Sequence, residues 1–110
     1  MHNKQELREM SRIETIRVVR EVLATYRERR TSGRITVDVR SGKAIWVKPA
    51  VADVEAPEAF PDEAKVLQEL DETLREFQGE GVSGTVALVV CAGRGVGVEK
   101  VVELEKVRVG

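Results

Sequence analysis

Apolar residues in this chain follow a helical spacing and then a strand spacing, and the whole succession occurs twice, 51 positions apart. Between residues 13 and 26 they recur every three or four positions, which places them on one face of a helix. Between residues 35 and 39 they alternate with polar residues, as in a strand with one buried face. Both patterns return at 67–77 and 86–90. The residues are Ile13, Ile16, Val19, Leu23 and Tyr26, then Ile35, Val37 and Val39; in the second half they are Leu67, Leu70, Leu74 and Phe77, then Val86, Leu88 and Val90.

Signals for the ends of helices recur at the same offset. Ser11 and Glu14 form a Ser-x-x-Glu capping box, and Asp62, another strong N-cap, stands 51 positions after Ser11. The helical patterns are followed by the breakers Thr31-Ser32-Gly33 and Gly79-Glu80-Gly81. A repeat of this length corresponds to one supersecondary unit used twice. The sequence therefore predicts two tandem helix–hairpin (αββ) repeats.

The first hairpin is predicted to run through a three-residue loop at 40–42 into a strand at 43–48. This register pairs Val37 with Ile45 and collects the β-branched side chains on one face of the sheet. It also gives the loop a glycine at its left-handed position. Trp46 then points outward, away from the predicted core.

The second hairpin follows the same reasoning, with a loop at 91–93 and a strand from 94 to about 102. Further on, the alternation slips in phase over 101–109, which fits either a bulged long strand or a separate short strand. The segment between the hairpin units holds all three prolines and several acidic residues, which is typical of a solvated linker.

These elements predict a single α+β domain. Its parts are a flexible N-terminus at 1–10, repeat one at 11–48, an acidic linker at 49–61 and repeat two at 62–110. One helix with one hairpin is too small to be stable alone. We therefore expect a pseudo-twofold arrangement, with a four-stranded antiparallel sheet and both helices packed on one face. In an alternative arrangement the units swap between chains, and the sheet forms in a dimer.

Composition and charge limit the functional classes. The chain is 42% hydrophobic and 34% charged, which is typical of a globular protein. It has no apolar run of about 18 residues, and its polar start does not resemble a signal peptide, so we expect a cytoplasmic protein that does not bind membranes. Residues 1–50 hold 12 Lys+Arg and 6 Asp+Glu, whereas the remainder holds 6 and 13. This asymmetry fits nucleic-acid binding, or attraction between the two repeats or between two copies of the chain.

Residue types that support catalysis are scarce. Cys91 is the single thiol and His2 the single imidazole, and we do not expect a Cys–His pair because His2 lies in the N-terminal tail. The chain has no set of cysteines and histidines for a metal site. The glycine-rich run 93–97 sits in a hairpin, whereas phosphate-binding loops connect a strand to a helix. The sequence predicts a protein that is not an enzyme and has no cofactor or metal.

The outward face of the second hairpin is unusually apolar. Glycines in a strand often mark the close approach of another backbone, and exposed apolar patches often mark contacts. Our first hypothesis is therefore an interaction module that forms a homodimer through this face. In the alternative, residues 101–109 fold over the face within one chain. The predicted interface residues are Ala87, Val89, Cys91, Gly95 and Gly97.

Nucleic-acid binding by the basic first repeat is the alternative function. Clustered arginines favour phosphate contacts, and an outward tryptophan can stack on a base. Against this, Glu14, Glu21 and Glu28 are interleaved with the arginines, as on a solvated, ion-paired helix. The predicted contacts are Arg27, Arg29, Arg30, Arg34 and Trp46.

The second hairpin also resembles a known small family. The run Gly84-Thr85-Val86-Ala87-Leu88-Val89-Val90, then Gly93-Arg94, Val96, Val98, Glu99 and Lys100, and the closing Glu105-Lys106-Val107-Arg108 are similar to YezD-type bacterial proteins. The resemblance covers residues 66–108. Members of that family are short helix-plus-hairpin chains of uncharacterised function, so the resemblance implies no active site. It implies that one unit needs a partner, which here is the other unit. This chain differs by carrying the unit twice and by an insertion before Glu105.

Overall fold

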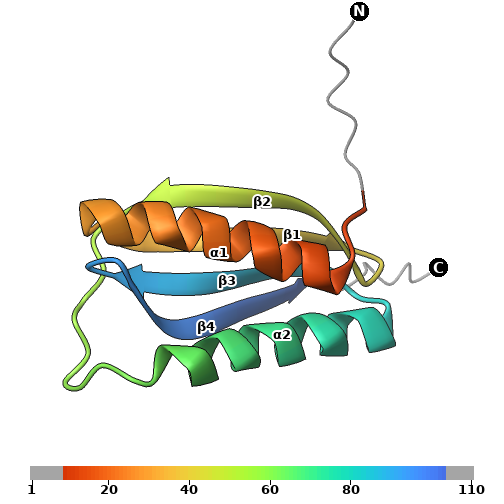
Figure 1. Ribbon diagram of the computed structural model, residues 1–110. Helices are drawn as coiled ribbons and strands as arrows, with labels where there is room; N and C mark the ends of the chain where they lie inside the picture. Colours follow the sequence, from red (N-terminus) through yellow and green to blue (C-terminus); the bar gives the residue numbers. More distant parts are fainter. Residues whose placement is uncertain (1–8, 104–110) are drawn as a thin grey trace, which may run out of the picture.

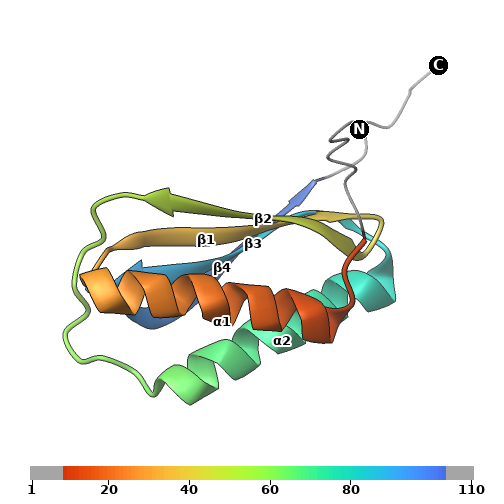
Figure 2. The ribbon, with the colours of Figure 1, turned by 45° about the horizontal axis from the view of Figure 1, so that its top comes forward.

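The computed structural model describes residues 9–103 and has two layers, an antiparallel sheet of four strands and a pair of helices on one of its faces (Figures 1 and 2). The strands lie in the order β2-β1-β3-β4, so the two hairpins meet at β1 and β3. This confirms the predicted α+β class and the antiparallel sheet. In chain order the elements are α1 (Arg12–Arg29), β1 (Gly33–Arg40), β2 (Lys43–Val51), α2 (Glu63–Glu80), β3 (Ser83–Cys91) and β4 (Arg94–Glu103).

Both helices begin at the predicted caps. The Ser11 hydroxyl accepts a hydrogen bond from the Glu14 N–H at 3.0 Å, and the Asp62 carboxylate accepts one from the Ala64 N–H at 3.0 Å. At their ends, Arg30 and Gly81 adopt the left-handed conformation, which closes the last turn. The second helix thus includes the predicted breaker residues 79 and 80 and ends at Glu80, with Gly81 as its C-cap.

The core lies between the helices and the sheet, and the predicted helical and strand faces supply it. The exception is Ile13, which lies in the first turn of α1 and is 80% exposed. The helix α1 packs mainly on β2, and α2 packs on β4 and β3. The core residues are Val19, Leu23 and Tyr26 from α1; Val66, Leu70, Leu74 and Phe77 from α2; Ile35, Val37 and Val39 from β1; Ala44 from β2; and Val86, Leu88 and Val90 from β3.

The predicted three-residue loop of the first hairpin is wrong. The turn has two residues, Ser41 and Gly42, with φ values of 50° and 82°. Two left-handed residues match the twist of the flanking strands, so this turn is favoured in tight hairpins. A bulge opposite the Asp38–Val39 step then restores the alternation, and Val37 pairs with Val47 rather than with Ile45. Trp46 lies opposite Asp38 and points outward as predicted.

The second hairpin has the same construction, which corrects one assignment. Its turn is Ala92-Gly93, and a bulge opposite the Val89–Val90 step places Gly95 opposite Val90. Gly97 lies opposite Val89. Gly95 and Gly97 were expected on one face, but they lie on opposite faces because the bulge inserts Val96 between them. β4 continues as one bulged strand to residue 103, and the predicted path of 104–110 lies outside the described residues.

Strand β2 is longer than predicted and ends at Val51 instead of residue 48. Pro49 fits within it, opposite Ile35, because β2 is an edge strand and one side of its backbone has no neighbouring strand in the sheet. The connection that follows passes the end of β3, where the Cys91 thiol lies 3.8 Å from the Val54 carbonyl oxygen. Of the predicted flexible N-terminus, residues 1–8 lie outside the described part.

Each turn docks on the other half of the chain. The Gly42 N–H donates to the Val82 carbonyl, and the Gly93 N–H donates to the Thr31 carbonyl, both at 2.8 Å. Both glycines are needed because the turns press against the helix ends: a Cβ on Gly93 would lie 2.6 Å from the Arg27 Cα. The hairpins and helices are therefore tied together across the middle of the molecule.

Candidate interaction surface on the outer face of the sheet

The sheet face opposite the helices is called the outer face below (Figure 2). It carries the predicted interface residues except Gly95, which lies on the helix side. The strand register shows which side chains lie on the outer face. Every second residue of β1 and β3 points into the core, so the residues between them, and those paired with them on β2 and β4, point outward. They form columns: Lys43, Trp46, Lys48 and Ala50 on β2; Arg34, Thr36, Asp38 and Arg40 on β1; Ser83, Thr85, Ala87, Val89 and Cys91 on β3; and Arg94, Gly97, Glu99, Val101 and Glu103 on β4.

The apolar strip on β3 is covered within the chain. Ala87, Val89 and Cys91 are only 7%, 9% and 6% exposed. Arg34 on β1 and Glu99 on β4 form a two-bond ion pair, with Nε–Oε1 at 2.8 Å and Nη2–Oε2 at 3.2 Å. Because β3 lies between these two strands, the ion pair spans it like a strap. The strip is thus on the predicted face, but it is not the open patch that the sequence suggested.

The strap also affects the ionisation of its members. The hydrogen bonds from the Arg34 guanidinium lower the pKa of Glu99, against a small opposing effect of burial. The same hydrogen bonds raise the pKa of Arg34. Both groups are therefore charged at neutral pH.

The two glycines of β4 have different surroundings. Gly95 lies on the helix side, where a Cβ would come within 3.3 Å of the Leu88 side chain, and its N–H donates to Glu63 at 2.8 Å. A Cβ on Gly97 would meet nothing within 4 Å among the described residues. The fold therefore explains Gly95, whereas the space on the outer side of Gly97, which pairs with Val89, is open among the described residues.

Two exposed apolar side chains flank the outer face. Trp46, 38% exposed, and Val101, 62% exposed, lie on the two edge strands. The register connects them in one row, in which Trp46 is opposite Asp38, Asp38 is opposite Thr85, and Thr85 is opposite Val101. The sequence analysis had singled out Trp46 but had missed Val101, because the bulge in β4 determines the side on which it lies.

Charge is unevenly distributed across the outer face. The β2 and β1 side holds Lys43, Lys48, Arg34 and Arg40 against Asp38, with Glu9 paired to Lys43 at 3.3 Å, whereas the β4 column holds Arg94 at its start, opposite Cys91, and then Glu99 and Glu103. Lys48 forms an ion pair with Asp38 at 3.3 Å. One edge of the face is therefore basic and the opposite edge is acidic.

The residues predicted for nucleic-acid binding are not brought together. Arg27 pairs with Glu63, and Arg34 pairs with Glu99. Arg29 and Arg30 lie exposed at the end of α1, which joins the start of β1, whereas Trp46 lies near the far end of β1. Four strand residues separate Arg34 from the row of Trp46, about 13 Å. No single surface therefore presents the whole predicted set.

Metal and nucleophile chemistry has little support in this part of the chain. Among residues 9–103, no three His, Cys, Asp or Glu side chains gather closely enough to hold a metal ion. Cys91 is buried, and His2 lies outside the described residues. No helix in the same range is long and apolar enough to cross a membrane.

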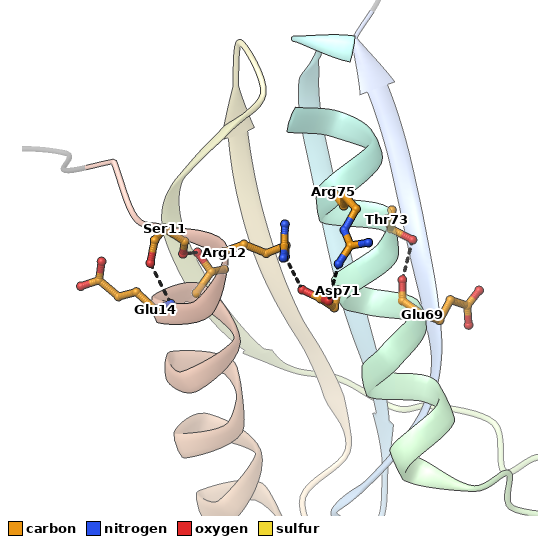
Figure 3. Close-up of polar contacts among 8 residues, drawn as sticks. Ser11, Arg12, Glu14, Glu69, Asp71, Thr73 and Arg75 are labelled. Carbon is orange, nitrogen blue, oxygen red and sulfur yellow. Dashed lines mark hydrogen bonds and ion pairs between the residues drawn. The ribbon is translucent and has the colours of Figure 1, made fainter. Parts of the chain in front are cut away.

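A groove between the two helices was not predicted from the sequence. It has a volume of about 340 Å³ and includes the exposed Ile13. Arg12 bridges the helices by an ion pair to Asp71, at 2.7 Å (Figure 3). The groove is lined by Arg12, Ile13, Ile16, Arg20, Ala64, Leu67, Gln68 and Asp71.

No protein-family model, curated protein or solved structure matches this chain. The basis for a functional proposal is therefore the geometry of these surfaces.

Proposed function

We propose that the protein is a small interaction module that associates with a second copy of itself through the outer face of the sheet. The observation that carries this proposal is Gly97. Glycine in a strand interior lowers stability relative to residues with side chains, and it is often found where another backbone approaches closely. Since no described side chain or backbone within the chain occupies the space over Gly97, a second chain is the occupant that gives this glycine a role.

The exposed side chains around Gly97 support the same conclusion. Trp46 and Val101 present apolar surface at the two edges of the face, and aromatic residues are enriched in protein interfaces. The acidic and basic edges give a second copy complementary charges to meet. Between these edges, the Arg34–Glu99 ion pair spans β3.

The size of the face predicts weak association. The strands β1 to β4 have 8, 9, 9 and 10 residues. At about 3.3 Å per residue and 4.8 Å between strands, the face measures roughly 500–600 Å² per protomer. Two such faces together approach the lower end of standard interfaces, about 1,200 Å² in total. We expect a reversible dimer with a Kd on the order of 1 μM to 1 mM.

We also propose that the fold is a tandem duplication with a pseudo-twofold axis at the pair Thr36–Ala87. These two residues are 51 positions apart and lie opposite each other in the sheet. The helices begin 51 positions apart, as do the two bulges. The turn bonds are reciprocal as well: the Ser41 N–H donates to the Ser83 hydroxyl and the Ala92 N–H donates to the Ser32 hydroxyl.

We further infer that the module is cytoplasmic and non-catalytic. A single buried cysteine suits a reducing compartment, because it does not depend on a disulfide. The resemblance of residues 66–108 to YezD-type proteins, which implies no active site, agrees with a binding role.

Sedimentation of wild type and Gly97→Arg tests the proposed association. The wild-type mass should rise with concentration, whereas Gly97→Arg should remain monomeric with an unchanged circular dichroism spectrum. Ala24→Arg, which adds the same side chain at an exposed position of α1, is the matched control and should associate like wild type. A wild type that stays monomeric at about 1 mM, the weakest affinity expected, would contradict the proposal. So would Gly97→Arg associating normally, because Gly97 would then serve only the bulge.

Nucleic acid is the second candidate partner, and the exposed Trp46 beside Lys48 on the outer face is the observation that favours it. Mixed single-stranded DNA and RNA at about 50 mM salt, a condition that preserves phosphate contacts, would then change the anisotropy of a labelled oligonucleotide and the fluorescence of Trp46. Absence of both changes removes this candidate.

A further inference from the structure

Resting on the proposed self-association, we infer that the twofold axis of the dimer runs parallel to the strands, so that β2 of each protomer lies over β4 of its partner. The inference comes from the arrangement of charged and apolar side chains on the outer face. Its consequence is that Lys48 of one protomer meets Glu99 of the other, which makes these two residues the determinants of partner orientation.

Two sheets related by a twofold axis can pack face to face in two limiting ways. An axis parallel to the strands reverses the order of the strands, so that β2 lies over β4 and β1 over β3, while each row of residues faces the same row. An axis across the strands places every strand over its own copy. Both produce an isologous interface, in which one surface meets itself, so the side chains must decide between them.

The charges favour the parallel axis. It places Lys48 over Glu99, because these residues lie on opposite edges in the row Lys48, Thr36, Ala87 and Glu99. One step beyond the last β1–β3 pair, it also brings Lys43, which pairs with Glu9 at 3.3 Å in its own chain, toward Glu103. Isologous symmetry forms each pair twice. An axis across the strands would instead place the basic column of β2 over itself and the acidic column of β4 over itself. Like charges facing each other in an interface are unfavourable.

The apolar side chains fit the same axis. Trp46 and Val101 share a row, so the parallel axis places the exposed ring of one protomer over the exposed Val101 of the other. Another row consists of Ala50, Arg34, Val89 and Gly97. There the parallel axis places Gly97 of one protomer over Ala50 of the other, and two small residues allow the backbones to approach. The open space over Gly97 therefore faces a partner residue that is small enough to let the sheets come close together.

Existing ion pairs are compatible with this contact. Glu99 is bound by Arg34 in its own chain, and Lys48 by Asp38 at 3.3 Å. A carboxylate can accept several hydrogen bonds, so Glu99 can hold Arg34 and the partner's lysine together. In the dimer the charges of this region alternate in sign, and none must lose its present partner.

Charge reversal tests the orientation. Lys48→Glu alone and Glu99→Lys alone should each weaken association by about tenfold or more, because each creates two like-charge contacts. The double variant should recover association relative to either single variant, because each contact between the two chains is again between opposite charges. An equimolar mixture of the two single variants should recover it as well. Lys65→Glu, an equal charge change on the helix side, is the matched control.

The outcomes separate this inference from the proposal on which it rests. If wild type does not associate, the proposed function fails and the orientation fails with it. If wild type associates and Gly97→Arg prevents it, the proposed function stands. In that case two results would show that only the orientation is wrong. One is a single charge reversal that leaves the Kd unchanged or lowers it. The other is a double variant that associates no more tightly than the more weakly associating single variant. Circular dichroism of each variant ensures that only folded chains are compared.

Discussion

Strands β1 and β3 pair with each other at the centre of the sheet, and toward the helices they present the same kind of surface. On that side each contributes three branched aliphatic residues that are at most 3% exposed. On the outer side they differ: β1 alternates buried and half-buried residues, whereas β3 is buried from Val86 to Cys91. The outer residues are Arg34, Thr36, Asp38 and Arg40 on β1, and Ser83, Thr85, Ala87, Val89 and Cys91 on β3.

The difference shows which positions the fold restricts. Positions facing the helices must be apolar in both halves, because they form one shared core. Positions on the outer face are free of that requirement, and there β1 supplies three charged residues, whereas β3 supplies small polar and apolar residues. Arg34 connects the two by reaching over β3 to Glu99. Differences between otherwise similar halves are therefore where a function is expected, and on this molecule they lie on the outer face.

The largest effect is expected from the helix side. Leu88 is fully buried, and Leu88→Ala should lower the free energy of unfolding by about 2–5 kcal/mol, because it removes core contacts and leaves a cavity. Thr36→Ala, on the outer side of the neighbouring strand, should change it by about 1 kcal/mol or less. Urea denaturation followed by circular dichroism measures both. Equal losses in the free energy of unfolding would show that the outer side of the sheet contributes as much to stability as the side that faces the helices.

A smaller loss is expected where the two halves touch through their turns. Gly93 has φ of 82°, and an added Cβ would lie 2.6 Å from the Arg27 Cα, so Gly93→Ala should cost about 1–3 kcal/mol. Gly79 lies in α2 with open space around it, and Gly79→Ala should stabilise the protein by about 0.5–1 kcal/mol, because alanine favours the helix. Thermal unfolding reports both changes. Effects of the same sign would contradict the described packing of the turn.

The sequence was sufficient for the elements and for the core. Periodicity identified both helical faces, because a helix that is buried on one side has an apolar residue at every third or fourth position. The tight turns had no comparable sequence signal, because Ser41 and Ala92 adopt positive φ although neither is glycine. A two-residue turn followed by a bulge gives the same apparent alternation as a longer loop. The predicted register was therefore wrong along each hairpin, where Val37 pairs with Val47 and Ile35 with Pro49, whereas the facing of Trp46 was correct.

The candidate surface depended on contacts that sequence patterns do not contain. Arg34 and Glu99 are 65 positions apart, and their ion pair depends on both flanking β3. Because of this pair, the exposure of Ala87 and Val89 is far lower than their outward position suggested. The different surroundings of Gly95 and Gly97 likewise follow from a bulge, which composition alone does not reveal.

A smaller, pH-dependent effect is expected at Glu63, where the two halves meet near the start of β4. Burial by itself would raise the pKa of Glu63, but the Gly95 N–H and the Arg27 guanidinium outweigh it, and the pKa is lowered. A lowered pKa stabilises the fold above the unfolded value, and this contribution is lost as the pH falls through the folded value. Glu63→Gln should therefore cost up to about 1 kcal/mol at pH 7. Denaturation at pH 7 and near pH 3.5 should show the difference shrinking; a difference that grows at low pH would contradict the pairing.

The smallest effect on stability is expected from making the outer side of β1 resemble that of β3. Thr36 lies at the centre of the outer face, opposite Ala87, and Thr36→Val exchanges a hydroxyl for a methyl group of similar size. Valine is also a good strand residue, so the free energy of unfolding should change by about 0.5 kcal/mol or less. If two outer faces pack together, however, the added methyl groups are removed from water on association. The Kd measured by sedimentation should then fall about two- to tenfold. A Kd that does not change, with Gly97→Arg still preventing association, would place the contact at the β4 side of the face and away from its centre.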